Sequence, residues 1–291
     1  MKYLFFYCFL FFGLNPLFGQ VSKNNNFKSS ESYYLNLLKN SPNDLDALES
    51  LGDIYSSLGS WYKALESYEK LVLLEDNNSN YQFKYGGVLA MLAKNGSKLK
   101  SLSFLKQAKT AFDKAEYLNP NSIELYWAQI ELYSQLPIIL GGDFEKAWQY
   151  SNKLEKLSKL NGFFAKAYIS KEKDDNDNFI FFIRKALEEW FKNDCIKNNK
   201  CIINNNINYQ IGVGIDLIDS DLEKALLYLK RYVQDYSAVD RYPLNIVYYE
   251  ISDIEFKLGD INSALKSLDN SLMLDPEFEN AKEKKKQLLK L

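Results

Sequence analysis

A pattern of small and aromatic residues within positions 45–78 constrains the fold of this chain more than any other feature. The pattern consists of Leu48, Leu51, Gly52, Tyr55, Ala64 and Tyr68. Its first four positions share one face of a helix, and its last two share one face of a second helix. Small residues at Gly52 and Ala64 let two helices approach closely, while Tyr55 and Tyr68 fill the space beside them. The pattern therefore predicts a helix–turn–helix unit of 34 residues that can repeat along the chain.

Landmarks of this pattern return along the chain at intervals that locate an insertion. Asp76 stands where a proline would end the unit, and Pro120 follows it by 44 residues. Ala108 likewise stands 44 residues after Ala64. Both intervals exceed the 34-residue unit by the same ten residues. We expect residues 94–103 to absorb this excess as a longer helix end and loop.

The third unit has a smaller excess, because Ala147 comes 39 residues after the preceding alanine landmark. Residues 136–141 account for the difference. We expect the first helix of this unit over residues 122–135. Asp143 should cap the second helix with its side chain. A pair of glycines before it supplies the permissive backbone for the turn.

The downstream part of the chain repeats the pattern less regularly. Three further helix pairs are expected, over 162–192, from Tyr209 onward, and over 248–276. Residues 193–208 are rich in Asn and contain two cysteines, which predicts an irregular loop. The strongly charged residues 277–291 predict a helix that caps the array with a polar face.

These residues resemble the tetratricopeptide repeat, whose pattern is W-x2-L-G-x2-Y, then A-x3-F, then P. Residues 45–78 follow it with Leu48 in place of Trp and Tyr68 in place of Phe. More narrowly, a set of motifs resembles a group of secreted bacterial tetratricopeptide proteins that have no defined activity. These motifs are Leu136-Pro137, Gly141-Gly142, Ala147, 162–168, 209–212 and 222–232.

The resemblance implies an all-α, right-handed superhelical solenoid of about six imperfect repeats. The array would span residues 45–276, after a segment over 20–44 that contains a lead-in helix. The resemblance also implies a scaffold, and we expect an adaptor for protein or peptide binding.

The first nineteen residues have the features of a secretory signal peptide. Lys2 is followed by an apolar run over 3–14, a breaker pair at 15–16 and the small residue Gly19. A membrane anchor is the alternative, but this apolar run is shorter than the roughly 20 residues that span a bilayer. We expect cleavage before Gln20, and a bacterial protein that leaves the membrane and is periplasmic or secreted.

Catalytic and metal-binding constellations are missing from the sequence. The chain contains no histidine, which excludes the histidine-dependent nucleophile arrangements and disfavours a zinc site. Cys195 and Cys201 would remain after signal cleavage, and in an exported protein they could form a local disulfide. We therefore expect no catalytic residues, no metal and no cofactor.

Candidate binding residues come from the first helix of each pair, which lines a concave groove in the resembling family. The acidic and aromatic residues on these faces are Asp46, Glu49, Asp53, Phe83, Glu124, Trp127, Glu131, Tyr249 and Asp253. They predict an acidic groove with aromatic contacts, suited to a protein segment that carries Lys or Arg. The chain has 38 acidic and 36 basic residues, so nucleic acid is not an expected partner.

Three alternatives to a basic peptide partner stay open at this point. Ordinary solvated helix faces would have the same composition. The array could also assemble with itself, through its ends or through exposed aromatic residues such as Trp190. A small molecule or glycan could bind instead, with Trp127 and Trp148 among its contacts.

Overall fold

A computed structural model describes most of the chain. The described residues are 20–95, 98–192, 205–218, 221–237, 240 and 242–290. The predicted signal segment and the pair Cys195 and Cys201 lie outside these ranges, so the cleavage site and the disulfide stay predictions.

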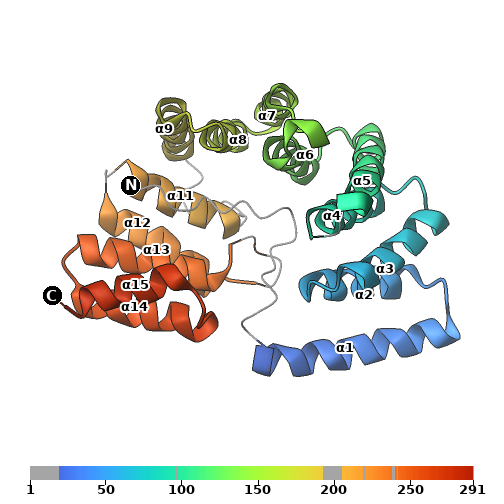
Figure 1. The fold of residues 1–291 in the computed structure, drawn as a ribbon, viewed down its shortest axis with the longest axis horizontal. Helices are drawn as coiled ribbons and strands as arrows, with labels where there is room; N and C mark the ends of the chain where they lie inside the picture. The colour runs from blue at the N-terminus through green and yellow to red at the C-terminus, as the bar shows by residue number, and fades with distance from the viewer. Residues whose placement is uncertain are drawn as a thin grey trace. The chain divides into compact units, whose positions relative to one another are not determined.

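Every regular element of the described residues is a helix (Figure 1). The helices are α1 (Gln20–Asn40), α2 (Leu45–Ser57), α3 (Trp61–Leu74), α4 (Ser79–Asn95), α5 (Lys98–Leu118), α6 (Ile123–Gln135), the 3-10 helix η1 (Ile138–Leu140), α7 (Phe144–Leu157), α8 (Lys159–Glu172), α9 (Asn176–Lys192), α11 (Asn205–Leu217), α12 (Leu222–Gln234), α13 (Leu244–Lys257), α14 (Ile261–Leu274) and α15 (Glu279–Leu288). They form two compact units, an N-terminal unit that ends at Ser158 and a C-terminal unit that begins at Lys159. The predicted all-α repeat fold is confirmed.

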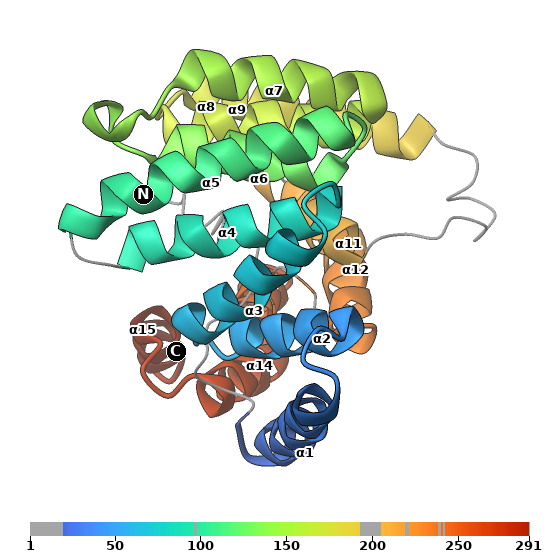
Figure 2. The same ribbon diagram turned by 90° about the vertical axis from the view of Figure 1, so that its right-hand side faces the viewer.

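Helices of the N-terminal unit pack as consecutive pairs, α2 with α3, α4 with α5 and α6 with α7. The lead-in helix α1 packs on α2, and α4 also packs on α3. Within this unit, α5 and α7 lie on the outer side and α4 and α6 on the inner side (Figure 1). Figure 2 shows α4 and α5 side by side over most of their length. The first helices of the second and third pairs therefore share one side of the unit.

The first pair shows why these residues form closely packed helices. Asp44 caps α2 by accepting a hydrogen bond from the Ala47 amide at 2.8 Å. Gly59, with a φ of 66°, makes the turn into α3. A Cβ atom on Gly52 would lie 2.4 Å from the buried Tyr68 ring, so only glycine permits this approach. The steric roles predicted for this pattern are confirmed.

Both predicted insertions appear at the expected places. The first is absorbed mainly by longer helices, because α4 has 17 residues and α5 has 21. The second forms η1 between α6 and α7, and Asp143 caps α7 by accepting hydrogen bonds from the amides of Glu145 and Lys146. Gly141 has a φ of 86°, and a Cβ on Gly142 would lie 1.8 Å from the Leu136 carbonyl oxygen. The turn into α7 therefore requires both glycines.

Helices of the C-terminal unit pair as α8 with α9, α11 with α12 and α13 with α14, and α15 packs on α14. The structure corrects one boundary, because α11 begins at Asn205, whereas the loop was predicted to extend to residue 208. The side-chain amide of Asn205 donates to the Tyr232 carbonyl and to Asp240, at 3.0 Å each. These contacts hold the polar start of α11 against the next helix. Among the described helices, none is both long and apolar enough to cross a bilayer.

Candidate functional site

A carboxylate–lysine network joins the first helices of the first two pairs in the N-terminal unit. Lys84 of α4 lies 2.6 Å from Glu49 Oε1 and 2.7 Å from Asp53 Oδ1, both on α2. The Lys84 side chain is only 16% exposed, so solvent screens these contacts less than it screens contacts on an open surface. We call Glu49, Asp53 and Lys84 the N-terminal network.

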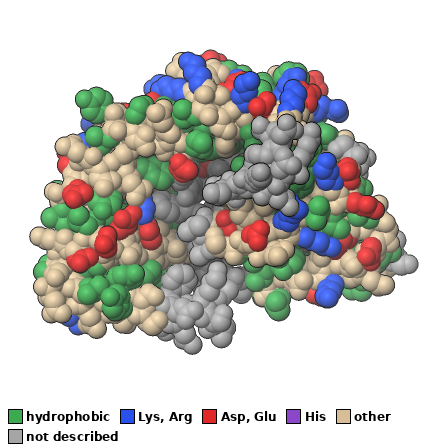
Figure 3. Space-filling model, turned by 180° about the vertical axis from the view of Figure 1, so that it is seen from behind, with side chains coloured by type: hydrophobic (Ala, Val, Ile, Leu, Met, Phe, Trp, Pro, Cys, Tyr) green, Lys and Arg blue, Asp and Glu red, His purple; other side chains and the backbone are tan. Residues whose placement is uncertain are grey.

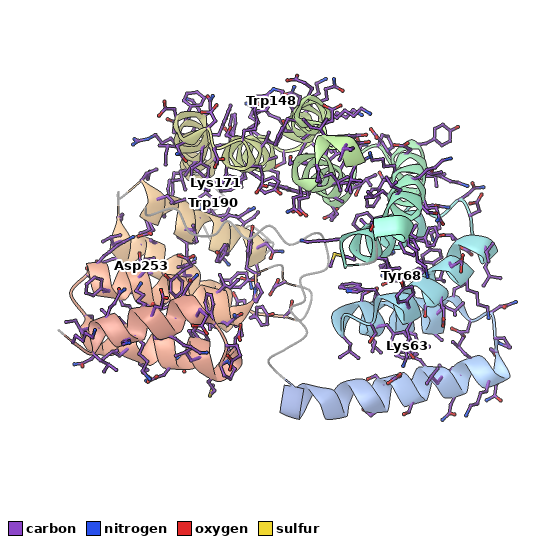
Figure 4. All side chains as sticks on the ribbon, viewed as in Figure 1. Lys63, Tyr68, Trp148, Lys171, Trp190 and Asp253 are labelled. Carbon is purple, nitrogen blue, oxygen red and sulfur yellow. The ribbon has the colours of Figure 1, made fainter. Side chains whose placement is uncertain are left out.

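Two neutral side chains fix the geometry of the N-terminal network. The Tyr68 hydroxyl donates to Asp53 Oδ1 at 2.6 Å, and the Asn80 amide donates to Glu49 Oε1 at 2.8 Å. Burial raises the pKa of the Tyr68 hydroxyl, and the negative charge of Asp53 raises it further. Tyr68 therefore stays protonated and keeps donating to the carboxylate. Figure 4 labels Tyr68 among the α2–α4 side chains.

A similar network lies in the C-terminal unit, on α11, α13 and α15. Lys257 of α13 lies 2.5 Å from Asp216 Oδ1 of α11 and 2.9 Å from Asp253 Oδ2 on its own helix. Lys284 of α15 lies 2.5 Å from Asp253 Oδ1. Asp253 is labelled in Figure 4. These four residues, together with Glu250 of α13, are called the C-terminal network.

Glu250 is the carboxyl group of the C-terminal network whose ionisation the lysines do not stabilise enough to offset burial. Burial raises its pKa to about 8, and the charges of Asp253 and Asp216 act in the same direction. The pKa of Asp253 shifts in the opposite direction. Burial opposes its ionisation, but the hydrogen bonds and positive charges of Lys284 and Lys257 hold its pKa below the usual range. Glu250 is therefore the group of this network that changes charge near neutral pH.

The two networks occupy equivalent positions in two repeats. Helix α14 has the bounds of α3 shifted by 200 residues, and Asp53 with Lys84 has the same 31-residue separation as Asp253 with Lys284. Sequence reasoning missed all three lysines, as well as Asp216 and Glu250. An aspartate followed by lysine at this separation, in both well-formed repeats, was the signal that could have revealed Lys84 and Lys284.

The structure brings some of the predicted binding residues into these networks and leaves others apart. Glu49, Asp53 and Asp253 are network members, and the half-buried Tyr249 lies 5.0 Å from the Lys284 ammonium, measured to the ring centroid. Three other predicted residues lie outside the networks: Asp46 and Glu124 are exposed, and Phe83 packs on Phe112 with the ring centroids 6.2 Å apart.

Two predicted groove residues are not at an open surface. Trp127 is 4% exposed and Glu131 is 0% exposed. Both lie in an unbroken run of buried residues over 125–134 of α6, so this stretch presents no open face. Helical spacing placed the two residues on one side of α6, but spacing alone does not show whether that side is covered. The expectation that they line an open groove is corrected.

The charge balance of the networks decides what they can bind. The N-terminal network has two carboxylates and one lysine, and the C-terminal network has three carboxylates and two lysines. Each network therefore has one carboxyl group more than lysines. In the C-terminal network this gives a net negative charge only when Glu250 loses its proton. A net negative charge favours an added cation. Seen from behind, the N-terminal unit shows several acidic side chains and few basic ones (Figure 3). Among the described residues, no cluster of three or more His, Cys, Asp or Glu side chains could hold a metal ion.

Comparison with known proteins supports the repeat assignment. The family model described as "Tetratricopeptide repeat" matches residues 45–78 and 247–278, which include Asp53 and Asp253. A search of curated proteins finds no match to the chain.

Two solved structures share the fold. A tetratricopeptide repeat protein from Parabacteroides merdae ATCC 43184 is 14% identical, with a TM-score of 0.52 over 92% of this chain and 94% of that chain. The APC/C hetero-tetramer Cut9-Hcn1 contains a chain that is also 14% identical, with a TM-score of 0.55 over 91% of this chain and 47% of that one. At this identity the likeness concerns the fold alone. Together with the paired helices, the matches show that the chain has the fold of tetratricopeptide repeat proteins and contains tetratricopeptide repeats at residues 45–78 and 247–278.

Proposed function

We propose that the protein is a non-catalytic adaptor whose two networks bind protein segments that carry Lys or Arg. The observation that carries the proposal is that each network has one more carboxyl group than lysines, around the equivalent pairs Asp53–Lys84 and Asp253–Lys284 of two repeats. Repeat arrays present extended surfaces to other proteins, and the first helices of this chain place fixed charges on such a surface. A negative charge on this surface predicts a partner segment with a positive charge.

In the N-terminal network, Asp53 is the group placed to meet a partner. Its side chain is 49% exposed, while that of Lys84 is 16% exposed. The lysine and the Tyr68 hydroxyl hold the carboxylate in one position from within the unit, and its outer side stays open to solvent. An incoming ammonium or guanidinium group would then form a charge-assisted hydrogen bond to a carboxylate that is already oriented.

In the C-terminal network, binding would be coupled to the loss of a proton. Glu250 has a pKa of about 8, so it is mostly neutral at pH 7. A bound cation favours the ionised carboxylate, so part of the binding free energy at pH 7 is used to remove the proton. The affinity of this site should therefore rise between pH 6 and pH 9.

A binding assay with matched variants tests the proposal. The probe is a set of fluorescein-labelled peptides that contain Lys and Arg, each paired with a Gln-substituted counterpart. The double variant Glu49→Gln/Asp53→Asn should weaken binding by about tenfold, because it removes both carboxylates of one network. The control, Asp46→Asn/Glu124→Gln, makes the same change in charge on exposed residues outside the networks. Equal affinity of the two variants, or equal binding of the Gln peptides, would show that the networks do not bind cations.

We further propose that the adaptor works in a bacterial cell envelope after export. The signal-like residues 1–19 support this location. Mass spectrometry of the protein recovered from a periplasmic fraction should find an N-terminus at Gln20. Recovery from the cytoplasm with residues 1–19 intact would contradict the proposal.

A further inference from the structure

A groove between α14 and α15 has an apolar floor and a basic rim. Its volume is about 430 Å³, and its lining residues are Leu272, Lys282, Lys285, Lys286, Leu289 and Lys290. Lys282, Lys285 and Lys286 lie on α15, and Leu289 and Lys290 follow directly after its last residue. All five keep helical spacing, so they form one stripe. The other side of α15 packs on α14 through the buried Ala281 and Leu288. The groove thus lies on a side of α15 that is separate from its packing face.

The equivalent stripe of the N-terminal unit shows what such a groove accommodates. Helix α4 begins 200 residues before α15, so Tyr85, Gly86, Leu89 and Ala90 are the counterparts of residues 285, 286, 289 and 290. In α4 this stripe packs against α5. A Cβ on Gly86 would lie 2.8 Å from the Phe112 ring of α5, and Leu89 and Ala90 belong to the same buried cluster as Phe112. The repeat geometry therefore places a helix at this position.

Electrostatics distinguishes the groove at α15 from its counterpart at α4. Lys285, Lys286 and Lys290 replace an uncharged aromatic residue, a glycine and an alanine. Lys282 and Lys285 have acidic neighbours at 2.9 Å and 2.5 Å, whereas Lys286 and Lys290 form no ion pair with any described residue. A helix in this groove would need acidic side chains beside the apolar residues that contact Leu272 and Leu289.

We propose that this groove binds an amphipathic helix of a partner protein, with an apolar stripe flanked by Asp and Glu. This groove differs from the N-terminal and C-terminal networks and favours a partner of the opposite charge. Helix α1 of a second copy is a poor occupant, because it carries Lys23, Lys28 and Lys39 against the single acidic residue Glu31. The charge of the groove thus favours a different protein over self-assembly.

The test uses the full chain and a designed, fluorescein-labelled peptide of about 18 residues, long enough to form a helix. The peptide has Leu at helical spacing with Glu on both flanks, and a second version has Lys in place of every Glu. Fluorescence anisotropy should show the Glu peptide binding at least about tenfold more tightly than the Lys peptide. The variant Lys286→Glu/Lys290→Glu should lose about tenfold in affinity for the Glu peptide and gain affinity for the Lys peptide.

The control Lys100→Glu/Lys106→Glu changes two exposed lysines of α5 and should leave the affinity unchanged. The variant Leu289→Gln should also weaken binding, and its side chain is 66% exposed, so the fold should be retained. Thermal unfolding by circular dichroism checks that each variant is folded. Glu49→Gln/Asp53→Asn should bind the Glu peptide normally, which separates this test from the test of the networks.

Four results would overturn the proposal. The first is equal binding of the Glu and Lys peptides, or no saturable binding of either. The second is unchanged affinity in the Lys286→Glu/Lys290→Glu variant. In the third, the protein sediments with phosphatidylglycerol vesicles through these lysines and does not bind the Glu peptide, so that the groove is a surface for anionic lipid. Concentration-dependent self-association that is lost in the same variant would also overturn it, in favour of a second copy.

Discussion

Single residues set how closely the helices of this array can approach. Gly52 faces the ring of Tyr68, where a Cβ would meet the ring carbon Cε1 at 2.4 Å. Gly214 lies in the interior of α11, and a Cβ there would meet its neighbours at 3.5 Å or more, which is ordinary van der Waals contact. The two glycines therefore have different roles, although both are helical.

The variants Gly52→Ala and Gly214→Ala should change stability in opposite directions. Gly52→Ala forces Tyr68 or the helix to move and should cost about 1–3 kcal/mol of the free energy of unfolding. Gly214→Ala should stabilise its helix by roughly 0.5–1 kcal/mol, because alanine loses less conformational freedom on folding. Chemical denaturation monitored by circular dichroism measures both. An equal effect of the two substitutions would contradict the role given to Gly52.

The protonation of Glu250 also makes a prediction at the scale of one residue. Its ordinary pKa is 4.5, and burial raises it to about 8 in the folded protein. The folded state therefore binds this proton more tightly than the unfolded state. The resulting stability is fully present below about pH 4.5 and is lost as the pH rises through about 8.

Glu250→Gln should remove this part of the pH dependence. Between pH 5 and pH 9 the midpoint of unfolding of the C-terminal unit should fall in the native protein and fall less in the variant. The lowered pKa of Asp253 acts only in more acidic solution, as the pH falls below its usual range, so it does not mask the effect. Thermal denaturation at several pH values provides the measurement, and parallel curves for the two proteins would count against the assignment.

At the scale of helices, caps and small residues made most of the elements predictable. Ser122 and Asp143 mark the starts of α6 and α7 because their side chains accept backbone hydrogen bonds within the first turn. These signals are local in sequence. The start of α11 at Asn205 was missed because its polar residues are held by Tyr232 and Asp240, about 30 residues downstream.

Capping energies give a matched pair of variants at this scale. Asp143 accepts hydrogen bonds from two amides at the start of α7, whereas Ser60 precedes α3 without a side-chain capping hydrogen bond. Asp143→Ala should therefore cost about 1 kcal/mol of stability, and Ser60→Ala should cost clearly less. Urea denaturation of the two variants compares them directly. A larger loss for Ser60→Ala would be inconsistent with the caps seen in the structure.

At the scale of the whole molecule, repetition explains both the successes and the gaps of sequence reasoning. The repeat pattern predicted which helix faces carry Glu49, Asp53 and Asp253. It did not predict that Lys84 and Lys284 reach back to the preceding repeat, because that contact depends on how neighbouring repeats pack. It also did not show that Trp127 and Glu131 are covered. At this scale the central claim is that the carboxyl groups of the two networks bind a basic partner.

Zero-length crosslinking with a carbodiimide in intact cells tests that claim most directly, because this reagent joins a carboxylate to a nearby lysine amine. Mass spectrometry should find Glu49, Asp53 or Glu250 joined to lysines of another protein. The same crosslinks should be lost in Glu49→Gln/Asp53→Asn and Glu250→Gln but kept in Asp46→Asn/Glu124→Gln. Partner crosslinks that map only outside the two networks, or that persist unchanged in the network variants, would contradict the claim.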